Sequence, residues 1–335
     1  MTNHLLCCDW GTSFFRLQLM NTADDRCLDE IQSPIGIADT FDNWRGTGEG
    51  LPREQFFRQQ LSGQIELLAS RLSMNLTNVP IVISGMASSS IGIEQIPYAT
   101  LPFALDGSQA STRQFNAQPD FPHDMLLISG VRSEDDVMRG EETQLIGLIA
   151  LLDVSGHKLA DAVCIFPGTH SKHLYLQNRQ LIQFNTYMTG ELFDLMAKRS
   201  ILKDSVELTN VSDFSETNNK AFRQGIRQAK SSVILNSLFK VRTNQLFDKL
   251  TKEENAFYLS GQLIGIELNH LVESETESLV LCGGSNLSAF YELAIDELRL
   301  TNRTLTISTE LIDRAASVGQ IRLFQNSVLG KLVSG

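Results

Sequence analysis

Asp9 and the turn after it are residues whose types and spacing could do chemistry. The turn contains Gly11, Thr12 and Ser13, and it separates an apolar run from a segment of alternating apolar residues, which is the period of a β-strand. Successive N–H groups of such a turn can bind a phosphate, and Thr and Ser hydroxyls add donors. A carboxylate beside the turn repels phosphate unless Mg²⁺ lies between them. These residues alone favour a phosphate site and a plain hairpin turn with a solvated Asp9 equally.

A related pattern recurs in the second half of the chain. Gly168 and Thr169 align with the Gly-Thr of the first turn at an offset of 157 residues. In both places an apolar strand, a Gly-Thr turn and an alternating strand follow one another, which indicates two similar halves. The second turn has no acidic residue but carries His170 and Lys172. Opposite the first turn, these side chains could supply positive charge to a polyphosphate.

A third glycine turn lies closer to the C-terminus. Gly283, Gly284 and Ser285 follow the apolar strand SLVLC and precede a segment expected to be helical. Glycines at a helix N-terminus allow a nucleotide to pack closely against the backbone. The motif is not G-x-G-x-x-G, so a dinucleotide-binding Rossmann site is not expected. An ordinary strand-to-helix turn explains the Gly-Gly pair at least as well.

The segment EDDVMRGEETQ concentrates acidic residues after the apolar strand MLLISGV. Binding sites collect at the carboxyl ends of strands in open α/β sheets, and a carboxylate there could accept a proton from a hydroxyl. Asp136, Glu141 and Glu142 are therefore candidate bases. A solvated charged face is the alternative interpretation.

The composition excludes several classes of protein. The chain has 335 residues, enough for two domains, and its net charge of −11 argues against nucleic-acid binding. No apolar run approaches the ~18 residues of a membrane span. The first residues lack the basic segment of a signal peptide, so we do not expect one. The five cysteines are scattered and lack C-x-x-C spacing, which fits reduced thiols in a cytoplasmic protein.

Periodicity and capping predict the elements that must position these residues. We expect a helix over 53–72, begun by Pro52 where proline is tolerated, and a helix over 139–152 whose acidic first turn complements the helix dipole. Thr189 is expected to cap a helix over 190–199. The polar segment 204–218 is expected to be a surface loop. Further strands are expected within 27–31, 79–86, 125–131, 163–177, 179–188, 278–282 and 303–309, and further helices over 256–272, 287–295 and 310–325.

Taken together, these residues resemble those of the 2-keto-3-deoxygalactonokinase family. The blocks DWGTS-x-x-R, SGM followed by PY-x-x-x-P, D-x-MRGEETQLIG, PGTHSK and MTGEL occur here in the order found in that family. They lie at 9–16, 84–86 with 97–98, 136–147, 167–172 and 188–192, and so span most of the chain.

The resemblance implies an α/β protein with two actin-like (ribonuclease H-like) domains, residues 1–155 and 156–335. Each would be a mixed β-sheet flanked by helices, and a central cleft would hold ATP–Mg²⁺ and a sugar acid. The two Gly-Thr turns then look like the first and second phosphate loops of that fold, and the Gly-Gly turn like its adenosine loop. The implied reaction transfers the γ-phosphoryl group of ATP to the 6-hydroxyl of 2-keto-3-deoxy-D-galactonate, within galactonate catabolism.

The resemblance also implies roles for individual residues. Asp9 would organise Mg²⁺, and Asp136, Glu141 or Glu142 would act as the base, with the two Glu residues at the helix start preferred. Arg139 could pair with the substrate carboxylate, because Arg suits bidentate recognition. Contacts to ATP are expected from Gly11, Thr12, Ser13, Arg16, Gly168, Thr169, His170, Lys172, Gly283, Gly284 and Ser285, and contacts to the sugar acid from Ser84, Gly85, Met86, Arg139, Thr189, Gly190 and Glu191.

Two departures from the family pattern leave alternatives open. The second phosphate loop lacks the Asp common elsewhere in the superfamily, and Ile93 stands where the family usually has Trp. Because the loop 87–95 is expected to contact the sugar acid, one rival is a kinase of the same fold for a different 2-keto-3-deoxy sugar acid. The other is a non-catalytic regulator that keeps the fold as a ligand sensor, although the intact acidic residues speak against it. The sequence leaves the oligomeric state open, a homodimer included.

Overall fold

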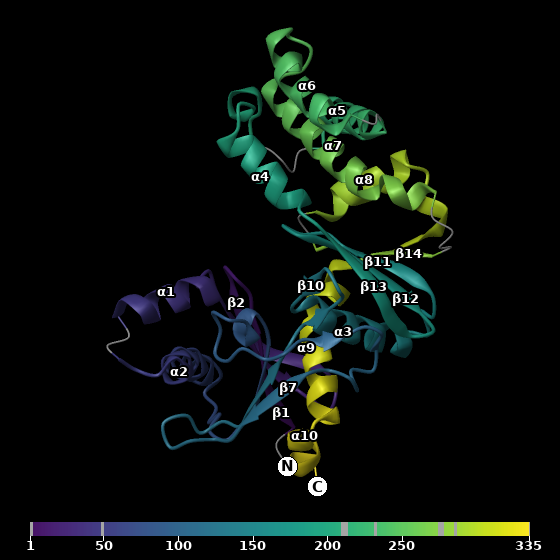
Figure 1. Cartoon of the computed structure of the whole chain (residues 1–335). Helices are drawn as coiled ribbons and strands as arrows, with labels where there is room; N and C mark the ends of the chain where they lie inside the picture. The colour runs from purple at the N-terminus through teal and green to yellow at the C-terminus, as the bar shows by residue number, and fades with distance from the viewer. Residues whose placement is uncertain are drawn as a thin grey trace. The chain divides into compact units, whose positions relative to one another are not determined.

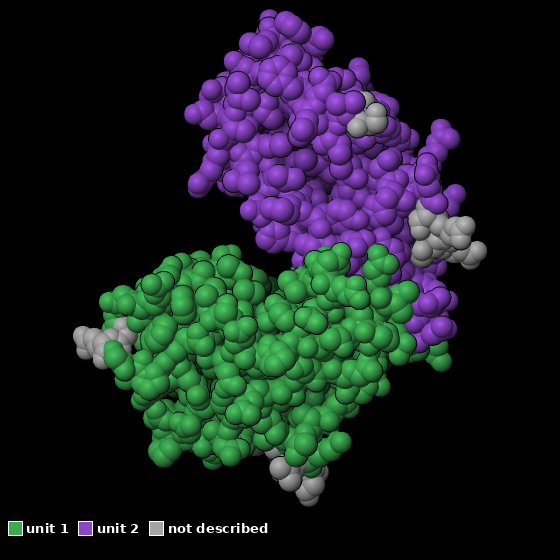
Figure 2. All heavy atoms as spheres, viewed as in Figure 1, with its two compact units in different colours: residues 1–159, 179–183, 310–335 green, residues 160–178, 184–309 purple. Residues whose placement is uncertain are grey.

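The computed structural model describes residues 3–47, 50–208, 214–230, 233–273, 278–284 and 287–334. The chain forms two compact units, coloured separately in Figure 2. Unit 1 contains residues 1–159, 179–183 and 310–335, and unit 2 contains residues 160–178 and 184–309. The C-terminal residues from 310 onward therefore group with the N-terminal part of the chain, whereas the sequence prediction placed everything after residue 155 in one domain.

Unit 1 is built on a six-stranded mixed sheet in the order β3-β2-β1-β4-β8-β7. β1 pairs antiparallel with β2, and β2 with β3, whereas β4 lies parallel to both β1 and β8. A small second sheet has the order β10-β9-β5. The strands are β1 His4–Trp10, β2 Phe15–Asn21, β3 Arg26–Ser33, β4 Ile81–Gly85, β5 Ala99–Thr100, β6 Phe103–Ala104, β7 Thr112–Phe115, β8 Met125–Ile128, β9 Val131–Arg132 and β10 Val137–Met138.

Helices complete unit 1. α2 begins directly after Pro52, as predicted, and buries Phe57, Leu61 and Leu68 in a core shared with Leu6 and Trp10 of β1. Burial of such side chains stabilises by about 1.5–3 kcal/mol each, so this core holds the helix on the sheet. The described helices are α1 Ile37–Thr47, α2 Arg53–Leu72, the 3₁₀ turn η1 Met86–Ser88, α3 Glu141–Val154, α9 Thr309–Asn326 and α10 Val328–Ser334.

Glycine contacts explain why α9, near the C-terminus, belongs to unit 1. A Cβ on Gly147 of α3 would lie 1.8 Å from the Ala315 carbonyl oxygen, and one on Gly319 would lie 1.9 Å from the Thr143 carbonyl oxygen. The two helices therefore touch backbone to backbone. Gln320 of α9 also donates to the carbonyl of Cys8 in β1, at 2.7 Å.

Unit 2 repeats the arrangement of unit 1. Its sheet has the order β15-β14-β11-β12-β13. The first residues of β13, 180–183, belong to unit 1, where β6 pairs with Gln180 and Leu181. β11 is antiparallel to β12 and parallel to β14, which is parallel to β15. The order matches β8-β4-β1-β2-β3, so the sequence repeat corresponds to a duplicated sheet. The strands are β11 Ala162–Phe166, β12 Ser171–Gln177, β13 Gln180–Tyr187, β14 Leu279–Leu281 and β15 Thr304–Thr306.

Helices α5, α6 and α7 of unit 2 pack together, as Figure 1 shows. α7 begins with a capping box in which Thr251 and Glu254 exchange hydrogen bonds. A Cβ on Gly225 of α5 would lie 2.2 Å from the Tyr258 carbonyl oxygen of α7, so glycine permits this close crossing. No helix within the described ranges is long and apolar enough to cross a membrane. The helices are α4 Thr189–Arg199, η2 Lys203–Ser205, α5 Glu216–Ala229, α6 Ile234–Leu246, α7 Lys252–Val272, α8 Ser288–Glu297 and η3 Thr301–Arg303.

Two local predictions were wrong. Thr189 is the first residue of α4 rather than its cap; Met188 occupies the capping position, because the Thr189 hydroxyl donates to Glu267 instead. The predicted loop 204–218 contains η2 and the first turn of α5, where Ser215 Oγ accepts the Asn218 amide at 3.3 Å. Residues 209–213 of that segment lie outside the described ranges.

Candidate functional site

The first glycine turn joins β1 to β2. The Gly11 amide donates to the Phe14 carbonyl at 3.0 Å, which closes the hairpin. A Cβ on Gly11 would lie 2.2 Å from the Phe14 ring, so a larger residue there would displace this exposed side chain. Thr12 and Ser13 are exposed at the tip. The hydroxyls predicted to contact a phosphate are therefore accessible.

The N-terminus of α1 docks on this turn. The amides of Ile37 and Ala38 donate to the carbonyls of Gly11 and Thr12 at 2.9 and 3.1 Å. Gly36 makes the approach possible, because a Cβ there would lie 2.2 Å from the Thr12 carbonyl oxygen. These bonds hold the turn against a helix that the sequence prediction did not include.

Asp9 lies near the end of β1, directly before the turn, and pairs across the sheet with Arg16 of β2 and Ser84 of β4. Loss of hydration raises the pKa of Asp9 from 3.8 to about 6; the charge of Arg16 opposes this rise and that of Glu141 adds to it. Within the described ranges its carboxylate accepts no hydrogen bond. An ionised carboxylate in such a setting is stabilised by a cation.

Two glycines bring the start of α3 next to Asp9. A Cβ on Gly85 would lie 2.7 Å from the Trp10 carbonyl oxygen and 3.3 Å from Asp9 Oδ1. Gly140 has a φ of +108°, and a Cβ there would lie 3.7 Å from the Gly85 Cα. The predicted substrate residues Ser84 and Gly85 thus meet the predicted metal residue and the acidic start of α3.

The two glutamates at the start of α3 lie in different surroundings. Glu142 is 2% exposed, and its carboxylate accepts hydrogen bonds from the Gly140 amide and the Thr143 hydroxyl, both at 2.8 Å. Burial, with the charge of Glu141, raises the pKa of Glu142 to about 7. Glu141 is partly exposed, and its carboxylate accepts the Arg139 amide at 3.0 Å. Glu141 is therefore the more accessible carboxylate of the pair.

Arg139 is fixed from several sides. Its Nη1 donates to the Ser88 carbonyl at 2.7 Å, to the Ser88 hydroxyl, and to Ser129 Oγ at 3.4 Å. Its guanidinium carbon lies 4.2 Å from the centre of the Tyr98 ring, a cation–π contact. These contacts connect Arg139 to η1 and to the PY motif. The sequence placed Ser88 in a loop expected to contact the sugar acid, but it did not indicate Ser88 or Ser129 as a partner of Arg139.

The loop 87–95 does not present Ile93 to solvent. Ile93 is 3% exposed and belongs to the core of unit 1, and its amide donates to the Ala87 carbonyl at 2.7 Å. The replacement of the family's usual Trp by Ile93 is therefore a substitution in the core. Met86, by contrast, is partly exposed. Asp136 lies in the connection between β9 and β10, before α3 begins, and its carboxylate accepts the Val137 amide at 2.7 Å.

The second glycine turn in unit 2 has the same docking geometry as the first. The Glu191 amide, at the start of α4, donates to the Thr169 carbonyl at 3.0 Å, the counterpart of the bond from Ala38 to Thr12. A Cβ on Gly190 would lie 2.7 Å from the Gly168 carbonyl oxygen. The duplication thus includes a helix N-terminus held on each turn.

The predicted cations of this turn are engaged within unit 2. His170 Nε2 lies 2.5 Å from Glu191 Oε2. Lys172 is 5% exposed, and its Nζ donates to the His170 carbonyl at 3.3 Å. The turn therefore brings together residues predicted to contact ATP and residues predicted to contact the sugar acid.

A buried hydrogen-bond chain supports the second turn. The Gly168 amide donates to Ser171 Oγ at 3.3 Å, Ser171 Oγ lies 2.8 Å from the Tyr291 hydroxyl, and this hydroxyl donates to Glu267 Oε2 at 2.8 Å. The same carboxylate accepts from the Thr189 hydroxyl, and its other oxygen lies 3.0 Å from His173 Nε2.

Burial and the Glu267 charge raise the pKa of Tyr291 well above its ordinary value, so Tyr291 stays protonated. Buried networks rigidify a site through the groups that are paired; the Nδ1 atom of His173, at the edge of this network, has no partner among the described residues. Glu267 and Tyr291 were missed in the sequence because they lie on helices far along the chain.

The third glycine turn links β14 to α8. A Cβ on Gly283 would lie 2.5 Å from Ser288 Oγ, whereas one on Gly284 would meet none of the described residues within 4 Å. Gly283 is therefore explained by packing, and the described residues leave open space beside Gly284. Ser285 lies outside the described residues.

The surroundings of Asp9 fit Mg²⁺ chemically. Mg²⁺ takes few protein carboxylates, because it keeps waters and binds substrate phosphates. In the part of the chain that the structure describes, no three His, Cys, Asp or Glu side chains converge as a metal site. The Asp9 carboxylate, to which none of the described residues donates a hydrogen bond, matches this sparse set of ligands.

Comparison with known proteins places these features in a family. The model of the 2-keto-3-deoxy-galactonokinase family matches residues 9–319, from Asp9 through both turns to α9. The chain belongs to this family. A Rhizobium meliloti (strain 1021) protein named "probable 2-dehydro-3-deoxygalactonokinase" is 32% identical over 305 residues, covering 89% of this chain and 90% of that protein.

Two further family comparisons agree. The 2-dehydro-3-deoxygalactonokinase of Escherichia coli strain K12 is 29% identical over 307 residues, 89% of this chain and 91% of that protein. A crystal structure from Sinorhizobium meliloti, provisionally named as a 2-dehydro-3-deoxygalactonokinase, has a TM-score of 0.74 at 28% identity and covers 96% of each chain. The predictions of an ATP-dependent kinase family and of an α/β fold are confirmed.

Proposed function

We propose that this family member transfers the γ-phosphoryl group of ATP to the 6-hydroxyl of 2-keto-3-deoxy-D-galactonate. The observation that supports the proposal most is the cluster in unit 1, where Asp9, Gly85, Arg139 and Glu141 meet at the end of β1 and the start of α3. Phosphoryl transfer depends on positioning and electrostatic stabilisation, and this cluster offers a carboxylate for a cation, a fixed guanidinium and an accessible base.

Glu141 is the proposed base. A general base must reach the proton that it abstracts, and Glu141 is partly exposed whereas Glu142 is buried and bonded to Gly140 and Thr143. Glu142 is then a positioning residue: its carboxylate accepts the Gly140 amide and so holds the tight turn at Gly140. The proposed base would accept the proton of the attacking hydroxyl as the new O–P bond forms and the bond from the γ-phosphorus to ADP breaks, with ADP as the leaving group.

Arg139 is the proposed partner of the substrate carboxylate. Its Nη1 is occupied by Ser88 and Ser129, while within the described ranges its other guanidinium nitrogens donate to no group. A guanidinium held on one side presents the other to a carboxylate in a fixed orientation. Ser84, Gly85 and Met86 would line the same part of the sugar-acid site in the N-terminal domain.

Each glycine turn is proposed, within its own unit, as a contact of ATP phosphate oxygens. In the first turn, Thr12 and Ser13 offer exposed hydroxyls beside Arg16. In the second turn, Gly168 and Thr169 are held by α4 and by the buried hydrogen bonds that run through Ser171. Asp9 would hold Mg²⁺, which supplies charge neutralisation to the phosphate oxygens when bound. Gly284 leaves room for the adenosine part. The free cysteines Cys7, Cys8, Cys27, Cys164 and Cys282 support a cytoplasmic location.

A coupled ADP-release assay over stereoisomeric 2-keto-3-deoxy sugar acids tests the proposal. We expect the galacto isomer to have the highest kcat/KM, and mass spectrometry of the product to place the phosphate on the 6-position. Turnover of another isomer with inactivity on the galacto isomer would refute the substrate. Tight ATP binding without turnover of any sugar acid would instead indicate a ligand-sensing regulator.

A further inference from the structure

Glu267 of α7 lies buried where three other elements of unit 2 meet. Its Oε1 atom lies 3.0 Å from His173 Nε2 of β12. Its Oε2 atom accepts hydrogen bonds from the Tyr291 hydroxyl of α8, at 2.8 Å, and from the Thr189 hydroxyl at the start of α4. The two oxygens of a carboxylate can accept about four such bonds, so this single side chain can hold β12, α8 and α4 together.

One side of this network reaches the second glycine turn. The Tyr291 hydroxyl lies 2.8 Å from Ser171 Oγ, and Ser171 Oγ accepts the Gly168 amide at 3.3 Å. Two side chains thus connect the Glu267 carboxylate to a backbone amide of the turn that is predicted to contact ATP. Both side chains are buried, and a hydrogen bond is stronger away from water.

The other side reaches the same turn through α4. Thr189 begins α4, and the amide of Glu191, two residues later, donates to the Thr169 carbonyl of the turn at 3.0 Å. A Cβ on Gly190 would lie 2.8 Å from Thr169 Cα, so the start of the helix rests directly on the turn. Because the two sides meet at adjacent residues of the turn, the contacts form a closed ring, and the Glu267 carboxylate joins its two sides.

The helices that carry Glu267 and Tyr291 pack tightly in the core of unit 2. A Cβ on Gly261 of α7 would lie 2.1 Å from the Phe222 carbonyl oxygen of α5, so these two helices touch backbone to backbone. Phe290 of α8 packs on the same Phe222, with ring centroids 5.5 Å apart. Close-packed interiors deform little. The ring is therefore supported by three helices, α5, α7 and α8, that are fixed against one another.

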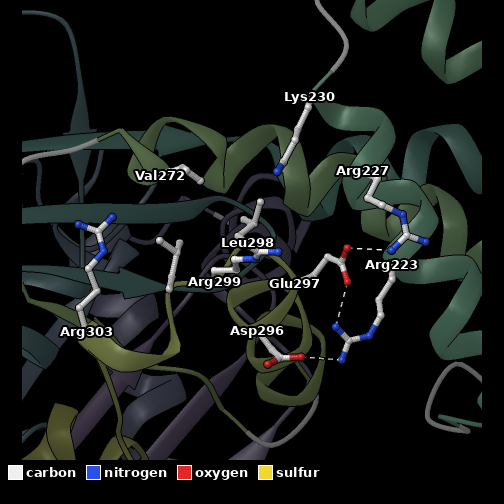
Figure 3. A pocket seen from close by; sticks show the side chains of 10 residues that line it. Arg223, Arg227, Lys230, Val272, Asp296, Glu297, Leu298, Arg299 and Arg303 are labelled. Atoms are coloured by element: carbon white, nitrogen blue, oxygen red, sulfur yellow. Dashed lines mark hydrogen bonds and ion pairs between the residues drawn. The ribbon is translucent and has the colours of Figure 1, made fainter.

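Ion pairs fix α8 further at its C-terminal end. Arg223 of α5 pairs with Asp296 at 2.7 Å and with Glu297 at 3.0 Å, and these two acids are the last residues of α8. Arg227, one turn later in α5, pairs with the same Glu297 at 2.8 Å. Figure 3 shows these pairs in the wall of a cavity of about 630 Å³. α8 is thus attached to α5 by ion pairs at its end and by apolar packing near its start, with Tyr291 between the two attachments.

We propose that Glu267 is a positioning residue that sets the second glycine turn and the start of α4 as one unit. This role rests on the proposed function, because it takes the turn as a contact of ATP and the start of α4 as a contact of the sugar acid. Glu267 acts through Tyr291 and Thr189 rather than on a reacting atom. Misplacing a contact by about 1 Å can lower a rate by about 10²-fold. Because the ring is closed, a break at either hydroxyl releases both segments.

The hydroxyl groups around Glu267 make it possible to separate the effect of geometry from that of charge. A hydroxyl can donate or accept, and a glutamine side chain has one acceptor oxygen and one NH₂ group with two donors. In Glu267→Gln the NH₂ group would take the place of Oε2 and donate to both hydroxyls. The amide oxygen would accept from His173 Nε2. The ring would thus be kept with the polarity of two bonds reversed, whereas Glu267→Ala removes both of them.

Calorimetric titration of the full chain with MgADP measures the effect on the turn. Tyr291→Phe and Thr189→Val each open the ring and should weaken MgADP binding by about tenfold, the scale of one lost hydrogen bond to a carboxylate. The double variant should also lose about tenfold, whereas independent effects would multiply to about a hundredfold. Glu267→Ala should resemble the double variant, and Glu267→Gln should bind within about threefold of the wild type, because no bond is lost. The matched controls Tyr258→Phe and Thr243→Val remove a buried and a half-buried hydroxyl elsewhere in unit 2 and should bind as the wild type does.

Steady-state kinetics separates failure of this role from failure of the proposed function. With the sugar acid that the wild type phosphorylates fastest, the ring-opening variants should lose kcat/KM for both ATP and the sugar acid, and Glu267→Gln should retain both. A wild type that phosphorylates no sugar acid would refute the proposed function, while the MgADP titrations would still decide the role of Glu267. The two hydroxyl variants keep the test decisive if Glu267→Ala does not fold. Losses that multiply in the double variant, unchanged MgADP affinity in both single variants, or Glu267→Gln binding as weakly as the double variant would overturn the role.

Discussion

Replacing Asp9 with Asn is expected to abolish most activity and, at the same time, to stabilise the protein without ligands. The carboxylate lies where it is poorly hydrated, and in the described part of the chain it accepts no hydrogen bond. Asn keeps the shape but removes the charge. Loss of one electrostatic contributor to a transition state reduces kcat by about 10²–10³-fold, or 2.7–4 kcal/mol.

The stability effect follows from the pKa of Asp9. A rise from 3.8 to about 6 corresponds to about 3 kcal/mol against the ionised form in the folded state. Because the pKa is higher in the folded state, the folded state holds the proton of Asp9 more tightly than the unfolded state does. The resulting contribution to stability is complete below pH 3.8 and is lost as the pH rises through 6. At pH 8 the ionised Asp9 therefore opposes folding by up to about 3 kcal/mol, and at pH 5 by about half of that. Asp9→Asn removes this opposition, so its stabilisation is larger at pH 8.

Denaturant unfolding of wild type and Asp9→Asn at pH 5 and pH 8, in EDTA and then in Mg²⁺ with ADP, measures both effects. Asp24→Asn, an exposed turn carboxylate, is the charge-matched control and should change neither activity nor stability beyond about 0.5 kcal/mol. MgADP should stabilise the wild type more than the variant. A variant with unchanged kcat at saturating Mg²⁺, or one destabilised equally at both pH values, would refute this reasoning.

Three other substitutions test separate parts of the site. Glu141→Gln should lower kcat by about 10²–10⁴-fold, as expected for loss of a general base, with little change in KM. If Glu142→Gln instead lost kcat to this extent while Glu141→Gln kept normal activity, Glu142 would be the base and Glu141 the positioning residue. Arg139→Lys should raise KM for the sugar acid about tenfold or more by losing bidentate geometry, without changing KM for ATP, and steady-state kinetics measures both. Tyr291→Phe should lower the free energy of unfolding by about 1–3 kcal/mol, because the Ser171 and Glu267 hydrogen bonds lose their shared partner; denaturant melts that coincide with the wild type would contradict the buried chain.

The sequence predicted most elements of both sheets because their signals are local. Alternating apolar residues marked β2 and β12, Pro52 marked the start of α2, and the 157-residue offset indicated the duplication that the sheet order confirms. Prediction failed where a distant partner decided the outcome. Thr189 has the residue type of a helix cap, yet its hydroxyl bonds to Glu267, 78 residues away. Ile93 was read as a change at a binding loop, yet it fills the core of unit 1.

What the sequence determined by itself is the set of chemical groups and their order: Asp9 before the first Gly-Thr turn, the glycines of the three turns, the acidic segment before the helix at 141, and the family motifs that span the chain. The tertiary structure decided which of these groups are accessible. It buried Glu142 and left Glu141 partly exposed, although the two are adjacent. It also linked the Gly168 turn to Tyr291, whose hydroxyl lies 2.8 Å from Ser171 across 120 residues of sequence. Such contacts depend on how helices and strands pack around a shared core, and no local pattern of residue types encodes them.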